Sequence, residues 1–291
     1  MSNAYAETDH ALAALYLQRI GFNGAFSPTL ANLQKLLFQH VTHIPFGNTA
    51  SFLGAGVPLD TEHLQNKLLV QHREGYCFEQ SLLAQQALSA LGYNAVNRLG
   101  RVYFMATPEQ TPAQSHLVTV VNVDGEEYLY DPNFGGMSPS APLSLSRIGQ
   151  TQQTPHEPYR LIPVSESGLN PDTLTGMHYM LQACVLGEWI NLYAFNPETP
   201  VAPLDVKVAN WYIATSPDSL FTQHLLMALA TPDSRINLMD NTVKIHSQAG
   251  TTQQVLETAE DFKKFFEESL KIAPGHVDYQ ALAEKVAGLL K

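Results

Sequence analysis

The stretch that decides the fold class runs from residue 116 to residue 131: His116-Leu-Val-Thr-Val-Val-Asn-Val123, then Asp124-Gly125, then Glu126-Glu-Tyr-Leu-Tyr-Asp131. Asp-Gly between two runs rich in β-branched and aromatic residues is a strong signal for a β-hairpin with a two-residue loop. That loop pairs Val123 with Glu126, so Asp131 lies opposite Val118. Because side chains alternate along a strand, His116 and Asp131 are predicted to be diagonal neighbours on one face of the sheet.

The residues before this hairpin have the apolar spacing of helices. Cap residues, prolines and glycines mark where each helix begins and ends. Four helices are expected: one capped by Asp9 that ends near Gly21, one opened by Ser27-Pro28 that ends before Pro45, one from Asp60 through Leu68, and one from Cys77 to Leu91 before Gly92.

Beyond residue 92 the periodicity changes to the two-residue alternation of strands. Short strands separated by turn residues fill 93–205, and the remainder mixes both kinds of element. In that remainder, strands are expected at 211–215 and 242–246, and helices at 221–230, 260–270 and 278–290. Helices followed by strands indicate an α+β fold and not a regular alternation. The expected divisions are 1–92, 93–205 and 206–291.

Composition limits the class of protein. The chain has 291 residues, is 45% hydrophobic and 15% charged, and carries a formal net charge of −11. These values are typical of a folded globular protein. The acidic excess argues against nucleic acid or an anionic membrane as a partner. With two cysteines and no apolar segment long enough to span a membrane, the sequence predicts a cytoplasmic protein.

Cys77 is the strongest candidate for a nucleophile. It stands in Arg73-Glu-Gly-Tyr-Cys77-Phe-Glu-Gln80, where a glycine precedes the predicted start of a helix. The positive end of a helix dipole stabilises a thiolate, and thiolate chemistry needs a base and a group that orients the base. Each residue alone also fits a structural role: Cys77 as a buried thiol, His116 as a strand-end histidine and Asp131 as a turn starter. Together, Cys77, His116 and Asp131 form a nucleophile–base–orienter set.

Other candidate sites are weaker. The spacing in His40-Val-Thr-His43 suits a metal, but no third ligand lies nearby in the sequence, so we expect a helix end and no metal. Phe134-Gly135-Gly136 allows a backbone to approach a ligand closely, without forming a dinucleotide-binding fingerprint. Cys184 is expected in the core, as are Phe262, Phe265 and Phe266.

Three short segments, one around each residue of the triad, match a known family. They read Arg73-Glu-Gly-Tyr-Cys-Phe-Glu-Gln-Ser81, Ser115-His-Leu-Val118 and Tyr130-Asp-Pro-Asn-Phe-Gly-Gly136. On these segments the sequence resembles the arylamine N-acetyltransferases. The resemblance extends from about residue 10 to 245 through further matching segments: Arg19–Phe22, Ile44–Phe46, Tyr159–Leu161, Leu192–Phe195 and Ala209–Phe221.

The resemblance implies an architecture and a reaction. The architecture is a helical bundle, a β-barrel-like domain and an α/β lid around a papain-like cysteine catalytic core. The implied triad is Cys77, His116 and Asp131. In the implied ping-pong reaction, acetyl-CoA acetylates Cys77, CoA leaves, and an arylamine or arylhydrazine then takes the acetyl group.

The resemblance also implies binding residues. Phe46 and Phe134 match positions that line the amine pocket in the family. Gly135 and Gly136 open a loop, 135–142, that matches the loop near the acyl donor. The implied partners are therefore acetyl-CoA as co-substrate and a small aromatic amine as acceptor, with no metal.

The sequence departs from the family pattern at several positions beside the triad. The family usually has a glycine where Glu74 stands and a glutamate where Gly47 stands. It has asparagine where Ser81 stands, and Pro132-Asn133 replaces a small residue and a glycine. We expect Glu74 to compensate the charge of Arg73, which the glutamate at the other position compensates in the family.

Other activities fit the same residues. The first is an amide synthase or an acyltransferase that uses malonyl-CoA, propionyl-CoA or a carrier-bound chain on the same scaffold. The second is a cysteine hydrolase or a transglutaminase-like enzyme, which would act without CoA. The third is a catalytically inactive binding protein, which the intact set of Cys77, His116 and Asp131 disfavours.

Overall fold

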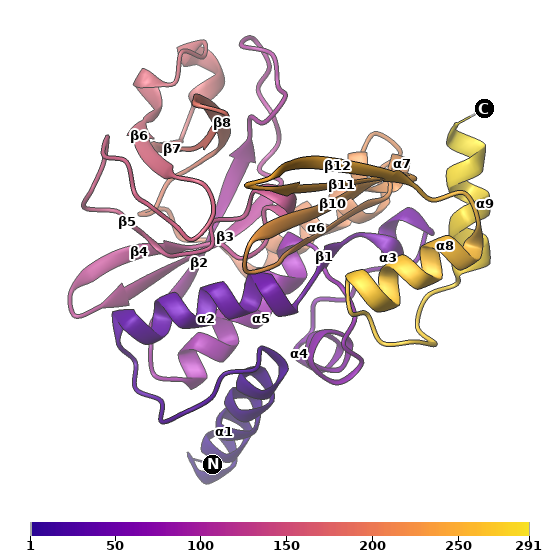
Figure 1. Cartoon of the computed structure of the whole chain (residues 1–291). Coiled ribbons are helices and arrows are strands. Elements are labelled where there is room, and N and C mark those ends of the chain that lie inside the picture. The colour runs from indigo at the N-terminus through magenta and orange to yellow at the C-terminus, as the bar shows by residue number, and fades with distance from the viewer. Residues whose placement is uncertain (1, 291) are drawn as a thin grey trace.

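The computed structural model describes the chain from Ser2 to Leu290, with side chains from His10 onward. Its N-terminal helices pack around an apolar core that includes the fully buried Tyr16, Leu33 and Leu83. This bundle lies in the lower part of Figure 1. It comprises α1 (Ser2–Arg19), α2 (Leu30–His43), α4 (Thr61–Gln65), the π-helical segment η1 (Asn66–Val70) and α5 (Cys77–Ala90). The short α3 (Thr49–Phe52) lies apart from it, and its Phe52 belongs to the core of the second sheet.

Two helices begin at residues other than those predicted. α1 begins at Ser2, so Asp9 lies within the helix and does not open it. α2 is capped by Thr29 and not by Ser27, because the Thr29 side chain accepts a hydrogen bond from the N–H of Asn32 (3.3 Å). The carbonyl of Ser27 instead accepts from the N–H of Thr29 (2.8 Å) and from the Asn32 side chain (2.9 Å). Ser27 therefore forms the turn that leads into the helix.

The predicted starts of α4 and α5 are confirmed. Asp60 caps α4 by accepting a hydrogen bond from the N–H of His63 (3.1 Å). α5 begins at Cys77, and Gly92 follows it with a φ of 91°, a conformation that glycine adopts without strain.

A seven-stranded antiparallel sheet forms a barrel-like layer beside the bundle (Figure 1). The predicted hairpin is confirmed, because Val123 pairs with Glu126 and Thr119 with Tyr130. The strand order is β5-β4-β3-β2-β8-β7-β6. Their bounds are β2 (Asn94–Val102), β3 (His116–Val123), β4 (Glu126–Tyr130), β5 (Leu143–Ser144), β6 (Tyr159–Pro163), β7 (Tyr179–Val185) and β8 (Glu188–Phe195).

A second antiparallel sheet takes one edge strand from the N-terminal part of the chain, because Phe46 of β1 pairs with Ala228 of β9. The C-terminal helices pack against it through Phe262, Phe265 and Phe266, which are buried as predicted. The elements are β1 (Phe46–Gly47), β9 (Leu226–Ala230), β10 (Ser234–Met239), β11 (Thr242–Ser247), β12 (Gly250–Val255), α8 (Ala259–Lys264), the π-helical η5 (Phe265–Ser269) and α9 (Tyr279–Leu289).

Two predicted elements of the C-terminal part are wrong. Residues 211–215 are not a strand but the end of α6 (Pro203–Thr215), whose buried Val206, Asn210 and Ala214 recur at helical spacing. Residues 221–230 are not one helix. They contain the end of the short α7 (Leu220–Gln223) and then β9, which lies between β1 and β10, so that tertiary pairing decides its conformation.

Other expectations for this part had mixed outcomes. The strand at 242–246 and the helices at 260–270 and 278–290 are confirmed as β11, α8 with η5, and α9. Cys184 is half-buried and not in the core, because β7 ends one residue later at a turn whose Leu186 is fully exposed. In the described part of the chain, no helix is both long and apolar enough to cross a membrane.

Candidate active site

Cys77 is the first residue of α5 and is only 3% exposed. Glu79 sets the start of this helix, because its Oε2 accepts a hydrogen bond from the N–H of Tyr76 (3.1 Å). Lys67 donates to the other oxygen of Glu79 (2.7 Å). Burial raises the pKa of Glu79, and Lys67 opposes that shift. The ion pair therefore holds the turn that places the thiol at the positive end of the helix dipole.

The loop before the nucleophile is fixed to β1 by backbone hydrogen bonds. The N–H of Gly75 donates to the carbonyl of Pro45 (3.2 Å), and the N–H of Gly47 donates to the carbonyl of Gly75 (3.0 Å). Gln80, in the first turn of α5, donates to the carbonyls of Pro45 (3.0 Å) and Gly75 (2.5 Å). A Cβ on Gly75 would lie 2.8 Å from Leu68 Cδ2, so this packing requires glycine.

His116 and Asp131 meet as the hairpin register predicts. The Nε2 of His116 lies 2.9 Å from Asp131 Oδ2, and both residues are buried. Cys77 Sγ lies 3.7 Å from the carbonyl oxygen of Ser115, the residue before His116. Burial alone lowers the pKa of His116, but the Asp131 carboxylate and a hydrogen bond with Cys77 outweigh it and raise this pKa to about 10. The imidazole therefore carries a proton at neutral pH, beside the sulfur of Cys77.

Both oxygens of Asp131 are held by further donors. Oδ2 also accepts a hydrogen bond from the Tyr193 hydroxyl (2.6 Å), and the Tyr193 ring lies 4.7 Å from the His116 ring. Oδ1 accepts from the N–H of Asn133 (3.2 Å). The Asn133 amide, in the orientation that satisfies both of its neighbours, donates to Oδ1 (2.8 Å) and accepts from the N–H of Ser81 (3.2 Å). These contacts fix the carboxylate that orients His116.

The sequence did not predict Tyr193 or the Asn133 amide as parts of the site. Tyr193 belongs to one of the segments that match the family, but its contact with Asp131 depends on the pairing of β8 with β2. Asn133 follows Asp131 by two residues, and its side chain can join Asp131 to Ser81 only because α5 packs against this turn. Neither contact has a local sequence signal.

Aromatic side chains surround the triad. The Phe134 ring lies 5.1 Å from the His116 ring in an edge-to-face arrangement. Phe46 packs edge-on against Phe221 (5.9 Å), whose ring also lies 5.4 Å from that of Tyr76, next to Cys77 in the chain. Phe221, which was not predicted as a binding residue, joins Phe46 to Tyr76, whereas Phe134 packs against His116. Such apolar walls suit a flat aromatic ligand.

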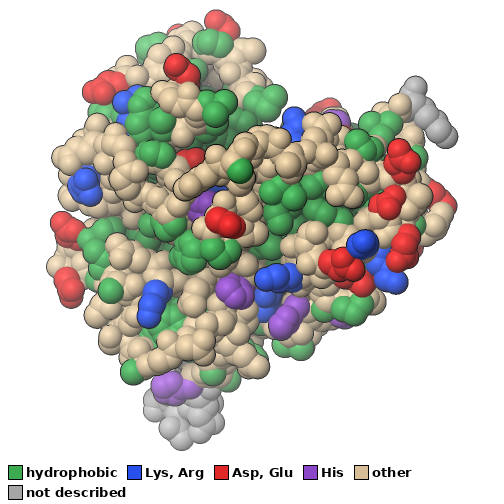
Figure 2. Space-filling model, in the orientation of Figure 1, with side chains coloured by type: hydrophobic (Ala, Val, Ile, Leu, Met, Phe, Trp, Pro, Cys, Tyr) green, Lys and Arg blue, Asp and Glu red, His purple; other side chains and the backbone are tan. Residues whose placement is uncertain are grey.

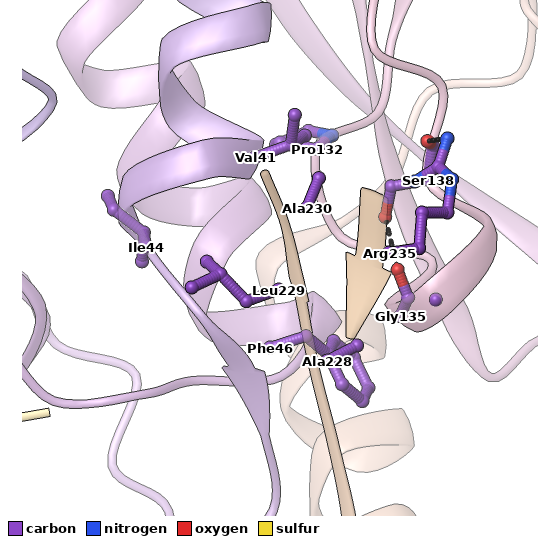
Figure 3. Close-up of a pocket in the computed structure, with 11 residues that line it drawn as sticks. Val41, Ile44, Phe46, Pro132, Gly135, Ser138, Ala228, Leu229, Ala230 and Arg235 are labelled. Carbon is purple, nitrogen blue, oxygen red and sulfur yellow. Dashed lines mark hydrogen bonds between the residues drawn. The ribbon is translucent and has the colours of Figure 1, made fainter. Parts of the chain in front are cut away.

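The turn that contains Gly135 and Gly136 is anchored to the second sheet (Figure 3). Arg235 of β10 donates to the carbonyl of Ser138 (2.9 Å). A Cβ on Gly136 would lie 1.9 Å from the Oδ1 of Asn237, so the absence of a side chain permits this packing. Between the turn and Phe46 lies a cavity of about 10 Å³, room for about one water molecule.

A larger cavity, of about 440 Å³, is lined by α3, the loop after it, η1 and residues 276–278. None of the three triad residues lines it. Among its charged residues, Lys67 pairs with Glu79, the Asp278 side chain caps α9, and Arg73 lies 3.5 Å from Glu74.

His40, in the last turn of α2, contacts Gln80 in the first turn of α5. It is fully buried, with its ring nitrogens 2.8 Å from the Tyr16 hydroxyl and 3.0 Å from Gln80 Oε1. Burial lowers the pKa of His40 to about 3, so the ring is neutral. His43 contacts the carbonyl of Gln39 (2.9 Å). Across the described residues, no three or more His, Cys, Asp or Glu side chains are grouped to hold a metal ion.

Sequence comparison relates the chain to known proteins over most of its length. A family model described as N-acetyltransferase matches residues 29–276. The arylamine N-acetyltransferase of Mycobacterium tuberculosis is 38% identical over 240 residues, which cover 81% of this chain and 80% of the relative. That of Escherichia coli is 32% identical over 219 residues, which cover 75% of this chain and 73% of the relative.

Structural comparison gives the same relation. The structure of Mycobacterium marinum arylamine N-acetyltransferase in complex with CoA has a TM-score of 0.85 and 36% identity, and covers 94% of this chain and 98% of that chain. The Mycobacterium smegmatis structure has a TM-score of 0.85 and 34% identity, and covers 95% of this chain and 97% of that chain. The predicted α+β fold, with its barrel-like sheet and papain-like cysteine core, is confirmed.

Proposed function

The chain belongs to the arylamine N-acetyltransferase family, and from that membership we propose that it transfers the acetyl group of acetyl-CoA to the nitrogen of an arylamine or arylhydrazine. One observation carries the proposal. Buried Cys77 begins a helix beside a protonated imidazole, and that imidazole lies 2.9 Å from a buried carboxylate. This arrangement supplies a nucleophile, a general acid–base and an orienting group.

In the first half-reaction, the Cys77 thiol has given its proton to His116, and the resulting thiolate attacks the carbonyl carbon of acetyl-CoA and forms a new carbon–sulfur bond. The negative charge on the carbonyl oxygen develops near the start of α5, where unpaired N–H groups and the helix dipole favour an anion. The bond to the CoA sulfur then breaks. The CoA thiolate takes the proton from His116 and leaves acetyl-Cys77 with a neutral imidazole.

In the second half-reaction, the amine nitrogen attacks the thioester carbonyl of acetyl-Cys77. Neutral His116 takes a proton from this nitrogen, and the Cys77 sulfur leaves as a thiolate. Because Nε2 of His116 faces Asp131, Nδ1 is the nitrogen that exchanges protons with the reacting groups. Asp131 keeps the ring in that orientation throughout.

Substrate selection follows from the walls of the site. Phe46, Phe134 and Phe221 offer ring faces and edges to an aromatic amine. Arylamines are weak bases and need an activated acyl group, which a thioester of a good leaving thiolate provides. The turn with Gly135 and Gly136 is the proposed acyl-donor side of the site.

Intact-protein mass spectrometry after brief mixing with acetyl-CoA tests the proposal. The wild-type chain is expected to gain a single acetyl group, which an added arylamine discharges. Cys77→Ala, checked for folding by circular dichroism, is expected to gain none.

A folded wild-type protein that gains no acetyl group would exclude acetyl-CoA as the donor. Malonyl-CoA and propionyl-CoA would then be tried in the same assay. An adduct with either of them would identify an acyltransferase with a different donor, and hydrolysis of an amide without CoA would identify a cysteine hydrolase.

A further inference from the structure

Glu74 occupies the space that a side chain at position 47 would need. A Cβ on Gly47 would lie 2.6 Å from Glu74 Cγ and 2.5 Å from Met227 Sδ. Glu74 is fully buried, and its Oε1 accepts a hydrogen bond from the Thr49 hydroxyl and lies 3.5 Å from the guanidinium of Arg73. The buried side chain of Glu74 therefore fills the space between β1 and the loop that precedes Cys77.

Asn133 and Ser81 make a second contact of the same kind, on the other side of the triad. Both residues are fully buried. Ser81 lies four residues after Cys77 on α5, and Asn133 lies two residues after Asp131. The Asn133 amide donates to Asp131 Oδ1 (2.8 Å) and accepts from the N–H of Ser81 (3.2 Å). One amide therefore joins the helix of the nucleophile to the carboxylate that orients the base.

The two contacts share a pattern. In each, a long polar side chain on one segment faces a small residue on the other: Glu74 faces Gly47, and Asn133 faces Ser81. Because the two residues of each pair touch, a polar group at nearly the same place can be supplied from either member.

We propose that Glu74 and Asn133 are positioning residues of the triad, and that each supplies a buried polar group that the small residue beside it, Gly47 or Ser81, could supply in its place if enlarged. The Glu74 carboxylate holds the loop before Cys77 against β1. The Asn133 amide holds Asp131, and through it the ring of His116. Neither residue touches substrate. The proposal rests on the proposed function for the reaction that the triad performs.

Two double-mutant cycles test this exchange. One combines Gly47→Glu with Glu74→Gly, and the other combines Ser81→Asn with Asn133→Gly. A mismatched double variant, Gly47→Glu with Asn133→Gly, is the control, because it changes one member of each pair. The readouts are the alkylation rate of Cys77 by iodoacetamide, located by peptide mass spectrometry, the kcat and KM for acetyl transfer, and the Tm.

The exchange predicts rescue within each pair. Asn133→Gly is expected to lower the alkylation rate and kcat about 10-fold, with KM changed less than about two-fold, because the loss concerns orientation and not substrate contact. Adding Ser81→Asn is expected to return both rates to within about three-fold of wild type. Gly47→Glu alone is expected to overpack or to fail to fold, and Glu74→Gly is expected to relieve it, since the flexible end of Met227 is then the remaining neighbour.

The proposal would be overturned if the two substitutions of a matched pair acted independently of each other. If each matched double variant is no better than the worse of its single variants, or if the mismatched double is rescued equally, the exchange does not exist. Alkylation and Tm do not depend on CoA. Rescue in these readouts without any acetyl transfer by wild type would therefore retain the positioning roles and refute the proposed function instead.

Discussion

His116 and Asp131 form one half of the site and Cys77 the other, and different forces hold the two halves. The first half lies on one hairpin, and its carboxylate accepts hydrogen bonds on both oxygens. The second half follows a loop flanked by Lys67–Glu79 and Arg73–Glu74 contacts. There, Arg73 Nε and Glu74 Oε2 are buried and find no hydrogen-bond partner among the described residues.

Because different forces hold the two halves, mutations in them are expected to have different consequences. In the hairpin half, strand register supplies the geometry and the hydrogen bonds refine it, so side-chain changes are expected to affect the reaction more than the fold. In the loop half, contacts of the buried Glu74 and Glu79 carboxylates with the partly buried Arg73 and Lys67 hold the chain in place. Changes there are expected to affect the free energy of unfolding more than the chemistry.

The largest expected effect comes from Asp131→Asn. The substitution keeps the shape of the side chain but removes the charge that raises the pKa of His116 and orients its ring. We expect kcat for acetyl transfer to fall about 10³- to 10⁴-fold, by analogy with other triads, with Tm lowered by only a few degrees. Steady-state kinetics and thermal unfolding of the same preparation measure both. A fall in Tm large enough to explain the lost activity would remove the distinction between the halves.

The second prediction concerns pH and the stability of the hairpin half. The pKa of His116 rises on folding from the ordinary value of 6.5 to about 10. A raised pKa stabilises the fold fully below the unfolded value, and that contribution is lost as pH rises through the folded value.

The wild type is therefore expected to be more stable than His116→Gln near pH 6, with the difference shrinking towards pH 10. Guanidinium chloride unfolding of both chains at several pH values measures it. A difference that stays constant or grows between pH 7 and pH 10 contradicts the charged state of His116.

Tyr193→Phe is expected to have a smaller effect in the same half. It deletes one donor to Asp131 Oδ2 and leaves the ring packed against His116. A hydrogen bond to a charged group contributes about 1.5–3 kcal/mol, and Asp131 retains its other partners, so we expect kcat to fall about 10-fold. Tyr179→Phe, on the neighbouring strand β7, is the matched control and is expected to change kcat less than two-fold.

The smallest effect on the reaction is expected from Glu74→Gln, in the loop half. The amide keeps the shape that fills the space beside Gly47 but removes the charge 3.5 Å from Arg73. We expect Tm to fall by about 2–6 °C and kcat to change less than three-fold. Differential scanning calorimetry checks the first value. An unchanged Tm would show that Glu74 does not compensate the charge of Arg73.

Local signals were sufficient where the structure depends on neighbours in the chain. The Asp124-Gly125 loop set the hairpin pairing, and that pairing placed His116 and Asp131 on one face. Gly92 and the turn before Cys77 likewise set the ends of α5. These features need only strand alternation, turn geometry and helix capping, which act over a few residues.

Predictions from the local sequence failed where contacts with distant segments outweigh local propensity. The run at 211–215 has the aromatic and β-branched composition of a strand, but it completes a helix whose buried face packs near Tyr76 and Cys77. Residues 226–230 have the composition of a helix, yet they pair with β1 and β10 on either side. In both cases packing against remote partners outweighs a propensity difference of less than about 1 kcal/mol per residue.

The sequence by itself determined the hairpin that brings His116 and Asp131 together and the helix that Cys77 begins, because each of these follows from spacing along a short stretch of chain. Only the tertiary structure decided what holds the triad. The Tyr193 hydroxyl, the Asn133 amide and the Glu74 carboxylate reach the site from segments whose approach is set by the packing of the bundle against two sheets. In that packing the Asp131 carboxylate and a hydrogen bond with Cys77 outweigh the effect of burial and raise the pKa of His116, so that it keeps its proton at neutral pH.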